Sequence, residues 1–283
     1  SIGIQSLQDD LLKALGRIHG RDEALRAIEI AQAAGFDNLN LDLMHGLPGQ
    51  SLEQAMDDLK TALAFKPSHL SWYQLTIEPN TEFYKETPQL PHEEVLWDIQ
   101  EAGQEILAAE GMAHYEVSAY SRSGYQSRHN VNYWQFGDYI GIGAGAHGKL
   151  TQPDGQIVRT RKTRLPEHYL SRYHSASNNS STNNSFVYRP GNLVPTFGNP
   201  YCAEETPIAK QDVGLECLMN ALRLNAGILV SDFEKRTGLT LEEVRKPLNL
   251  AINKGLLSVD ERLAPTELGR QYLNELLSIF LTD

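Results

Sequence analysis

Residues 38–50, NLNLDLMHGLPGQ, predict a short apolar strand that carries one carboxylate in its middle and ends in a turn rich in glycine and proline. The carboxylate belongs to Asp42, and it is costly inside a strand unless it is paired or binds a ligand. Polar groups near the carboxyl ends of parallel strands, next to glycine-rich turns, are where α/β folds bind ligands. Asp42 is therefore a candidate binding residue; the alternative is that it only caps a local turn.

Strands and helices alternate around this stretch. Apolar residues at helical spacing predict helices over residues 22–34, 51–65 and 91–110. Further strands are predicted over residues 2–6, 69–77 and 115–120. Such alternation implies a parallel sheet with right-handed crossovers. A complete barrel of eight units takes about 250 residues, so the pattern, which changes near Ser121, predicts part of a barrel or a small open sheet.

The composition is typical of a globular protein, with 283 residues of which 41% are hydrophobic and 22% are charged. A net charge of -11 argues against nucleic acid as the main partner. Two cysteines, Cys202 and Cys217, indicate a reducing cytoplasm and no disulfide framework. The sequence opens at Ser1 on what reads as the end of a strand, so we expect an N-terminal part of the barrel to be missing.

Residues 127–138, SRHNVNYWQFGD, are dense in aromatic and amide side chains. His129 in this run could bind a metal or haem iron through a neutral imidazole. The commoner alternative is a histidine that is hydrogen-bonded within a packed loop. We assign residues 121–174 to an extension of strands and loops that contains this run.

Residues 143–149 fit the phosphate-binding pattern G-x-x-x-x-G-K, but Leu150 stands where a serine or threonine is required. A dinucleotide site would need a helix next, whereas residues 151–156 read as a turn between strands. We therefore exclude both phosphate sites. The glycines are expected to allow close approach of another strand or of a flat ligand.

The rest of the chain is predicted to hold a linker and a second domain. Residues 175–207 are rich in serine and asparagine and then in proline and glycine, which indicates a flexible linker. Residues 208–283 predict three helices and a small hairpin, a winged-helix-like arrangement. Its third helix offers Arg245, Lys246 and Lys254 against Glu242 and Glu243, so a packing or lid domain is favoured over a DNA-binding regulator.

Several blocks together resemble the HemW family of radical SAM haem chaperones, which are related to oxygen-independent coproporphyrinogen III oxidase. The resemblance implies a partial (β/α)6 barrel over residues 1–120 followed by the family's C-terminal domain. The blocks are GIQS at 3–6, LGRIH at 15–19, the Asp42 stretch, LSWYQLTIEPNT at 70–81, and the His-Asn-x-x-Tyr-Trp run at 129–134.

The resemblance also implies ligand sites. Asp42 would accept hydrogen bonds from the ribose or amino group of S-adenosylmethionine, and Arg17 would pair with its carboxylate. The positions that match cofactor contacts are Gln5, Arg17, Asp42 and Thr76. The positions associated with haem are His129, Asn130, Tyr133 and Trp134, with His129 as the iron ligand.

One feature of the family is absent from this sequence. The [4Fe–4S] cluster of radical SAM proteins is held by C-x-x-x-C-x-x-C, and two cysteines 15 residues apart do not replace it. We therefore expect no reductive cleavage of S-adenosylmethionine by this chain. The favoured function is a chaperone that delivers haem to acceptor proteins, without nucleic acid and with a homodimer left open. The alternative is an oxygen-independent coproporphyrinogen III oxidase.

Overall fold

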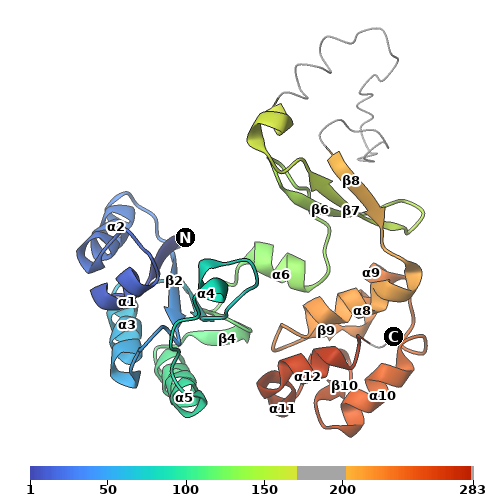
Figure 1. Cartoon of the computed structure of the whole chain (residues 1–283). Helices are drawn as coiled ribbons and strands as arrows, with labels where there is room; N and C mark the ends of the chain where they lie inside the picture. Colours follow the sequence, from blue (N-terminus) through green and yellow to red (C-terminus); the bar gives the residue numbers. More distant parts are fainter. Residues whose placement is uncertain (171–201, 282–283) are drawn as a thin grey trace. The chain divides into compact units, whose positions relative to one another are not determined.

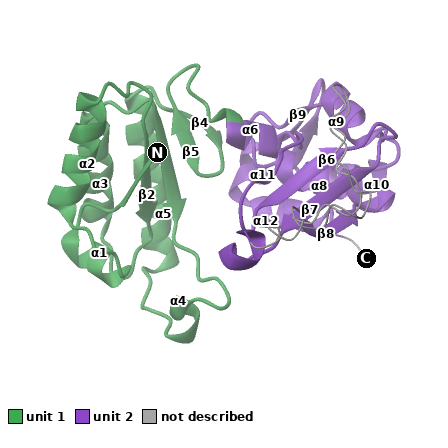
Figure 2. Cartoon of the chain, turned by 90° about the horizontal axis from the view of Figure 1, so that it is seen from above, with its two compact units in different colours: residues 1–128 green, residues 129–283 purple. Residues whose placement is uncertain are grey.

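The computed structural model describes residues 1–170 and 202–281 of the chain (Figure 1). The chain divides into two compact units, residues 1–128 and 129–283, which Figure 2 distinguishes by colour. Each unit has its own hydrophobic core. Across the two described ranges, no helix combines the length and apolar character needed to cross a membrane.

The first unit is built on a five-stranded sheet with the order β1-β2-β3-β5-β4. Strands β1, β2 and β3 are parallel, β5 is antiparallel to β3, and β4 is antiparallel to β5. The sheet is open, with β1 and β4 at its edges. The strands are β1 (Ile2–Gln5), β2 (Asn40–His45), β3 (His69–Gln74), β4 (Ala113–Glu116) and β5 (Ala119–Ser121).

Strand β2 alternates strictly between the two faces of this sheet. Leu41, Leu43 and His45 are buried, whereas Asn40 and Asp42 on the opposite face are half-buried. Leu41 and Leu43 belong to the core that also contains residues of α3 and α5. The period of two therefore puts the apolar residues against helices and leaves a polar face.

The three helices predicted for the first unit are confirmed as α2, α3 and α5, whereas α1 and α4 were not predicted. Ser51 caps α3, since its hydroxyl accepts a hydrogen bond from the Gln54 amide at 3.3 Å while Gln54 accepts from the Ser51 amide at 3.0 Å. This is the capping box that the sequence contains. The helices are α1 (Asp9–Ala14), α2 (Arg21–Ala33), α3 (Leu52–Ala64), α4 (Glu82–Lys85) and α5 (Glu93–Ala109).

The α/β class and the three parallel strands are confirmed, but the single strand predicted over residues 115–120 is wrong. This run forms the ends of β4 and β5, which pair antiparallel with Glu116 opposite Ala119. Val117 and Ser118 make the tight turn between them. The run looks continuous because apolar residues recur on both sides of a two-residue turn that carries no glycine signal.

The second unit begins at His129, the second residue of helix α6 (Arg128–Trp134), and continues with a three-stranded sheet in the order β6-β7-β8. Strands β6 (His147–Thr151) and β7 (Ile157–Lys162) form a hairpin, so the turn predicted at residues 151–156 is confirmed. Residues 202–207 form β8 (Cys202–Pro207) rather than the irregular chain expected there, because they pair with β7. Residues 175–201 of the predicted linker lie outside the described residues.

The C-terminal part has the predicted winged-helix-like order of three helices and a hairpin, and two short helices follow the hairpin. Strand β11 pairs with both β10 and β9. Two basic residues of the third helix are paired with carboxylates, Arg245 with Glu242 and Lys254 with Glu275, both at 2.8 Å. The elements are α8 (Lys210–Ala221), β9 (Ile228–Leu229), α9 (Val230–Thr237), α10 (Arg245–Asn253), β10 (Leu257–Val259), β11 (Arg262–Pro265), α11 (Glu267–Gln271) and α12 (Leu273–Ser278).

Candidate functional sites

Asp42 lies on the polar face of the first sheet, in the middle of β2. Its Oδ1 accepts a hydrogen bond from Asn40 Nδ2 at 2.8 Å, and its Oδ2 accepts one from Ser1 Oγ at 2.8 Å. A carboxylate has about four acceptor positions, so each oxygen can accept a further donor. Asp42 is therefore held in one orientation and is still able to bind a ligand.

Gln5 ends β1, the strand that pairs with β2 beside Asp42. Gly3 is the residue opposite Asp42, and the pairing of β1 with β2 is irregular between Gly3 and Gln5. Gln5 has a left-handed backbone, with φ of 65°. Its Nε2 lies only 2.8 Å from where a Cβ on Gly3 would stand, so the amide folds over the glycine. A side chain at position 3 would displace this amide.

Arg17 and Thr76 are exposed, and the structure does not join them to Asp42 or Gln5 by a hydrogen bond among the described residues. Arg17 follows α1, where its backbone amide donates to the Leu12 carbonyl at 2.9 Å. Thr76 comes two residues after the end of β3 and donates from its hydroxyl to Glu78 at 3.1 Å. Both side chains remain available to a ligand.

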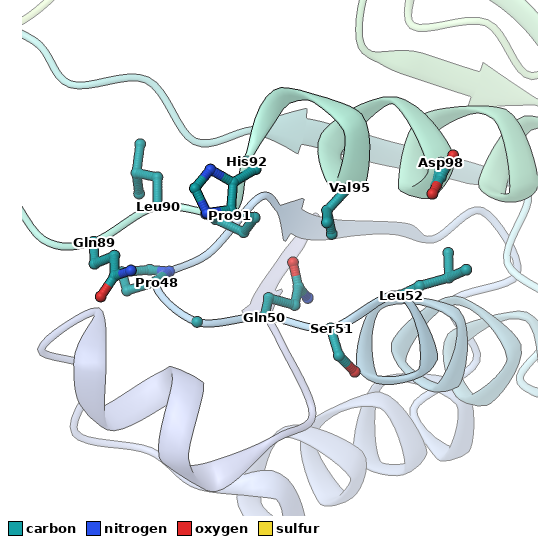
Figure 3. A pocket seen from close by; sticks show the side chains of 11 residues that line it. Pro48, Gln50, Ser51, Leu52, Gln89, Leu90, Pro91, His92, Val95 and Asp98 are labelled. Atoms are coloured by element: carbon teal, nitrogen blue, oxygen red, sulfur yellow. The ribbon is translucent and has the colours of Figure 1, made fainter.

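A cavity of about 650 Å³ lies beside the glycine–proline turn that follows β2 (Figure 3). Gln50 in its wall is only 2% exposed, and its Oε1 accepts from the Leu47 amide at 3.2 Å. Its Nε2 has no hydrogen-bond partner within the described part of the chain. Sequence reasoning pointed to this turn but missed the cavity, because the opposite wall comes from residues 89–98. Residues 48–52 and 89–92 line it, together with Val95 and Asp98.

The His-Asn-x-x-Tyr-Trp run forms most of α6. His129 is exposed and its ring meets that of Tyr133 edge-on, with centroids 5.1 Å apart. Tyr133 in turn stacks on Tyr139 at 4.1 Å. Burial raises the pKa of Tyr133 to about 12, so its phenol stays neutral at neutral pH. The helical spacing of four residues thus aligns an accessible imidazole with an aromatic stack.

The other residues of this run are half-buried. Trp134 lies beneath the Arg223 guanidinium, 5.2 Å from the ring centroid, and its buried Nε1 has no hydrogen-bond partner in the described residues. Asn130 is also half-buried on α6. Ile140 and Ile142, just after Tyr139, are 59% and 84% exposed. A flat apolar ligand would therefore find an imidazole, aromatic rings and exposed aliphatic side chains along one short segment.

The glycine-rich segment after α6 serves close backbone approach, as expected. A Cβ on Gly141 would overlap the backbone of His147. Lys149 of the G-x-x-x-x-G-K pattern is buried and pairs with Asp138 at 3.0 Å, over the ring of Phe136. Its ammonium group is therefore used within the protein, and the segment has no phosphate-binding architecture.

The donor set of this chain does not fit a [4Fe–4S] cluster. Cys202 lies in β8, where its sulfur accepts from Lys162 Nζ at 3.1 Å, and Cys217 is buried in α8; the two cysteines are not joined in a disulfide. Burial raises the pKa of Cys217 to about 12, which disfavours the thiolate that iron requires. No group of three metal-binding side chains occurs in residues 1–170 or 202–281.

Comparisons with known proteins match both the N-terminal and the C-terminal part of the chain. The radical SAM superfamily matches residues 1–62, and the HemN C-terminal domain matches residues 208–272. The chain is 43% identical over 284 residues to heme chaperone HemW of Haemophilus influenzae, which covers 100% of this chain and 67% of that protein. Identity to heme chaperone HemW of Escherichia coli K12 is 44% over 284 residues, with 100% and 68% covered.

A more distant relative and a solved structure extend this comparison. Heme chaperone HemW of Bacillus subtilis is 31% identical over 289 residues, covering 100% of this chain and 69% of the relative. The solved coproporphyrinogen III oxidase HemN of Escherichia coli, described as a radical SAM enzyme, superposes with a TM-score of 0.71 at 18% identity. It matches 98% of this chain and 62% of the solved chain, and at this identity it shows a shared fold.

The chain therefore spans about two-thirds of the length of its curated relatives and matches them from end to end. Its first unit contains the matched radical SAM segment, and its C-terminal helices contain the matched HemN C-terminal domain. We conclude that the chain belongs to the heme chaperone HemW family of the radical SAM superfamily.

Proposed function

We propose that this chain binds haem and delivers it to acceptor proteins, on a scaffold that also binds S-adenosylmethionine. The observation that carries the proposal is the exposed imidazole of His129 in front of the Tyr133–Tyr139 stack. It occurs in a chain that is 43% identical to a protein named heme chaperone HemW. The coproporphyrinogen oxidase alternative has no such support, because its solved example shares 18% identity.

Haem suits the α6 segment on chemical grounds. His129 would ligate the iron through a neutral imidazole nitrogen. Tyr133 and the exposed Ile142 would contact the porphyrin, whose face is flat and apolar. The amide of Asn130 is a donor of the kind that binds propionate oxygens. The indole N–H of Trp134, which is buried in this structure, would become such a donor if haem binding exposed it. Because α6 leaves His129 open to solvent, the haem would also remain accessible to an acceptor.

S-adenosylmethionine suits the polar face of the first sheet around Asp42. Asp42 would accept from hydroxyl or ammonium donors, and the Gln5 amide beside it can donate and accept. Arg17 would pair with the carboxylate of the ligand, and the Thr76 hydroxyl would contribute a further contact. Reductive cleavage of this ligand requires a [4Fe–4S] cluster, for which the two cysteines do not suffice, so no cleavage is proposed for this chain.

Acceptor proteins, a homodimer and a cytoplasmic location remain predictions. Two cysteines that are not joined in a disulfide are compatible with a reducing compartment. Delivery by direct contact would require an acceptor to approach α6, whose His129 is exposed.

The test is a haem titration followed by transfer. We expect saturable binding of about one haem per chain, seen as a shift of the Soret band. The loaded chain is then mixed with a panel of haem-free b-type haem proteins at increasing concentration. Direct delivery predicts a transfer rate that rises with acceptor concentration for at least one of them. Passive release predicts a rate that stays at the dissociation rate of haem, and absence of saturable binding would overturn the proposal.

A further inference from the structure

A continuous chain of hydrogen bonds crosses the polar face of the first sheet from Asp42 to the residue before α6. Asn40 lies opposite His69 in the β2–β3 register, with its Oδ1 2.6 Å from His69 Nδ1. His69 Nε2 lies 2.7 Å from the Tyr115 hydroxyl. That hydroxyl accepts from the Ser127 amide at 3.3 Å, and Ser127 directly precedes α6.

The direction of each hydrogen bond in this series, from donor to acceptor, is fixed by the chemistry of its groups. The Asp42 carboxylate only accepts, so the NH2 of Asn40 must donate to it, at 2.8 Å. The Asn40 oxygen then accepts from Nδ1–H of His69 and from the Ser71 hydroxyl at 3.1 Å. With its proton on Nδ1, a neutral His69 accepts at Nε2 from the Tyr115 hydroxyl. All the donors therefore point from α6 toward Asp42.

The surroundings favour this single arrangement. His69 and Tyr115 are 5% and 6% exposed, so water does not replace a lost partner easily. Burial lowers the pKa of His69 despite the opposing charge of Asp42, and it raises the pKa of Tyr115 to about 12. Both groups are thus neutral near pH 7, as the hydrogen-bond directions require.

We propose that Asn40, His69 and Tyr115 are positioning residues that couple S-adenosylmethionine binding at Asp42 to the haem-binding geometry of α6. The inference rests on the proposed function and adds the link between its two ligands. The Asn40 amide also donates to Ser1 Oγ at 2.7 Å, so a ligand that donates to Asp42 shifts the balance between these two acceptors. We infer that the change reaches α6 along the buried hydrogen bonds of His69 and Tyr115. Because such coupling is thermodynamic, haem must alter the affinity for S-adenosylmethionine by the same factor as the reverse.

The test measures both affinities in the whole chain, S-adenosylmethionine by calorimetry and haem by the Soret band, each with and without the other ligand. Tyr115→Phe removes only the hydroxyl that joins His69 to Ser127. Tyr120→Phe is the matched control, since it removes a buried hydroxyl from the same hairpin, at a residue that pairs with Leu70 on the core face. His69→Gln, which keeps a donor and an acceptor, serves as the conservative variant beside His69→Phe.

We expect wild type to show at least fivefold coupling between the two ligands. Tyr115→Phe and His69→Phe should reduce it to less than twofold and weaken S-adenosylmethionine binding at least fivefold. His69→Gln should retain part of it, and Tyr120→Phe should leave it intact. If wild type binds both ligands without coupling, or Tyr115→Phe behaves like Tyr120→Phe, the inference is wrong while the proposed function stands. If wild type fails to bind haem or S-adenosylmethionine, the proposed function fails in that respect and the inference with it.

Discussion

The indole of Trp72 in β3 lies directly against the backbone of Gly103 in α5, so that a Cβ on residue 103 would overlap the ring. Trp72 is 3% exposed and belongs to the core of the first unit. Gly103 is thus the point at which α5 approaches the sheet. Helix propensity alone would favour alanine over glycine at this position by about 1 kcal/mol. The glycine is needed because there is no room for a side chain.

We predict that Gly103→Ala destabilises the first unit by about 2 kcal/mol, because overpacking outweighs the gain in helix propensity. The measurement is urea unfolding followed by tryptophan fluorescence. Ala108→Gly on the exposed side of α5 is the control, and it should cost about 1 kcal/mol through propensity alone. A Gly103→Ala variant more stable than wild type would show that α5 does not pack as described.

His45 makes stability depend on pH. Its ring packs on Trp72 with centroids 4.2 Å apart, and burial lowers its pKa to about 4. The unfolded chain therefore takes up the proton first as the pH falls below the ordinary value of about 6.5. The contribution of His45 to the free energy of unfolding is complete above pH 7 and is lost as the pH falls from 7 to 4. From pH 7 to pH 5 the loss is about 2 kcal/mol.

The comparison of wild type with His45→Phe isolates this contribution. The variant should lose about 2 kcal/mol less than wild type between pH 7 and pH 5 in urea unfolding. His92→Gln, at an exposed histidine, should keep the wild-type slope. Equal slopes for wild type and His45→Phe would refute the assignment.

Asp58 in α3 holds the connection between β1 and α1. It is 1% exposed and accepts from the Ser6 hydroxyl at 2.7 Å and the Leu7 amide at 2.9 Å. Asp58→Ala would leave both donors unpaired, so we predict a loss of about 3 kcal/mol. Since this connection follows Gln5, binding of S-adenosylmethionine should weaken as well.

The neighbouring Asp57 offers a close control for this loss. Its side chain is 55% exposed and it pairs with Arg21 at 3.4 Å. Asp57→Ala should therefore cost less than about 1 kcal/mol. Circular dichroism melts of the two alanine variants make the comparison, and similar losses for both would argue against a special role of Asp58.

The sequence predicted the elements better than the contacts between them. The strand that carries Asp42 and the helix predicted over residues 51–65 have local signals in the sequence, and both elements are confirmed. The turn at Val117 and the strand β8 were missed because strand pairing, rather than local pattern, decides them.

The same limit applies to the candidate sites. Asp42 could be singled out as a charge within an apolar strand. The hydrogen bonds that lead from its partner Asn40 to His69 and Tyr115 could not, because they depend on the register that places Asn40 opposite His69 and on a hairpin that carries Tyr115 to His69. The cavity beside Gln50 is likewise lined by two segments that lie about 40 residues apart in the sequence, so the pattern of residues within one segment cannot predict it.

The most direct test of the central claim is a haem titration of wild type, His129→Ala and His147→Ala, followed by the position and intensity of the Soret band. His129 and His147 are both exposed histidines of the second unit, so each variant removes one exposed imidazole, but only His129→Ala removes the proposed iron ligand. We predict that His129→Ala shifts the band and weakens haem binding at least tenfold, whereas His147→Ala matches wild type. A His129→Ala protein with the affinity and spectrum of wild type would contradict the account.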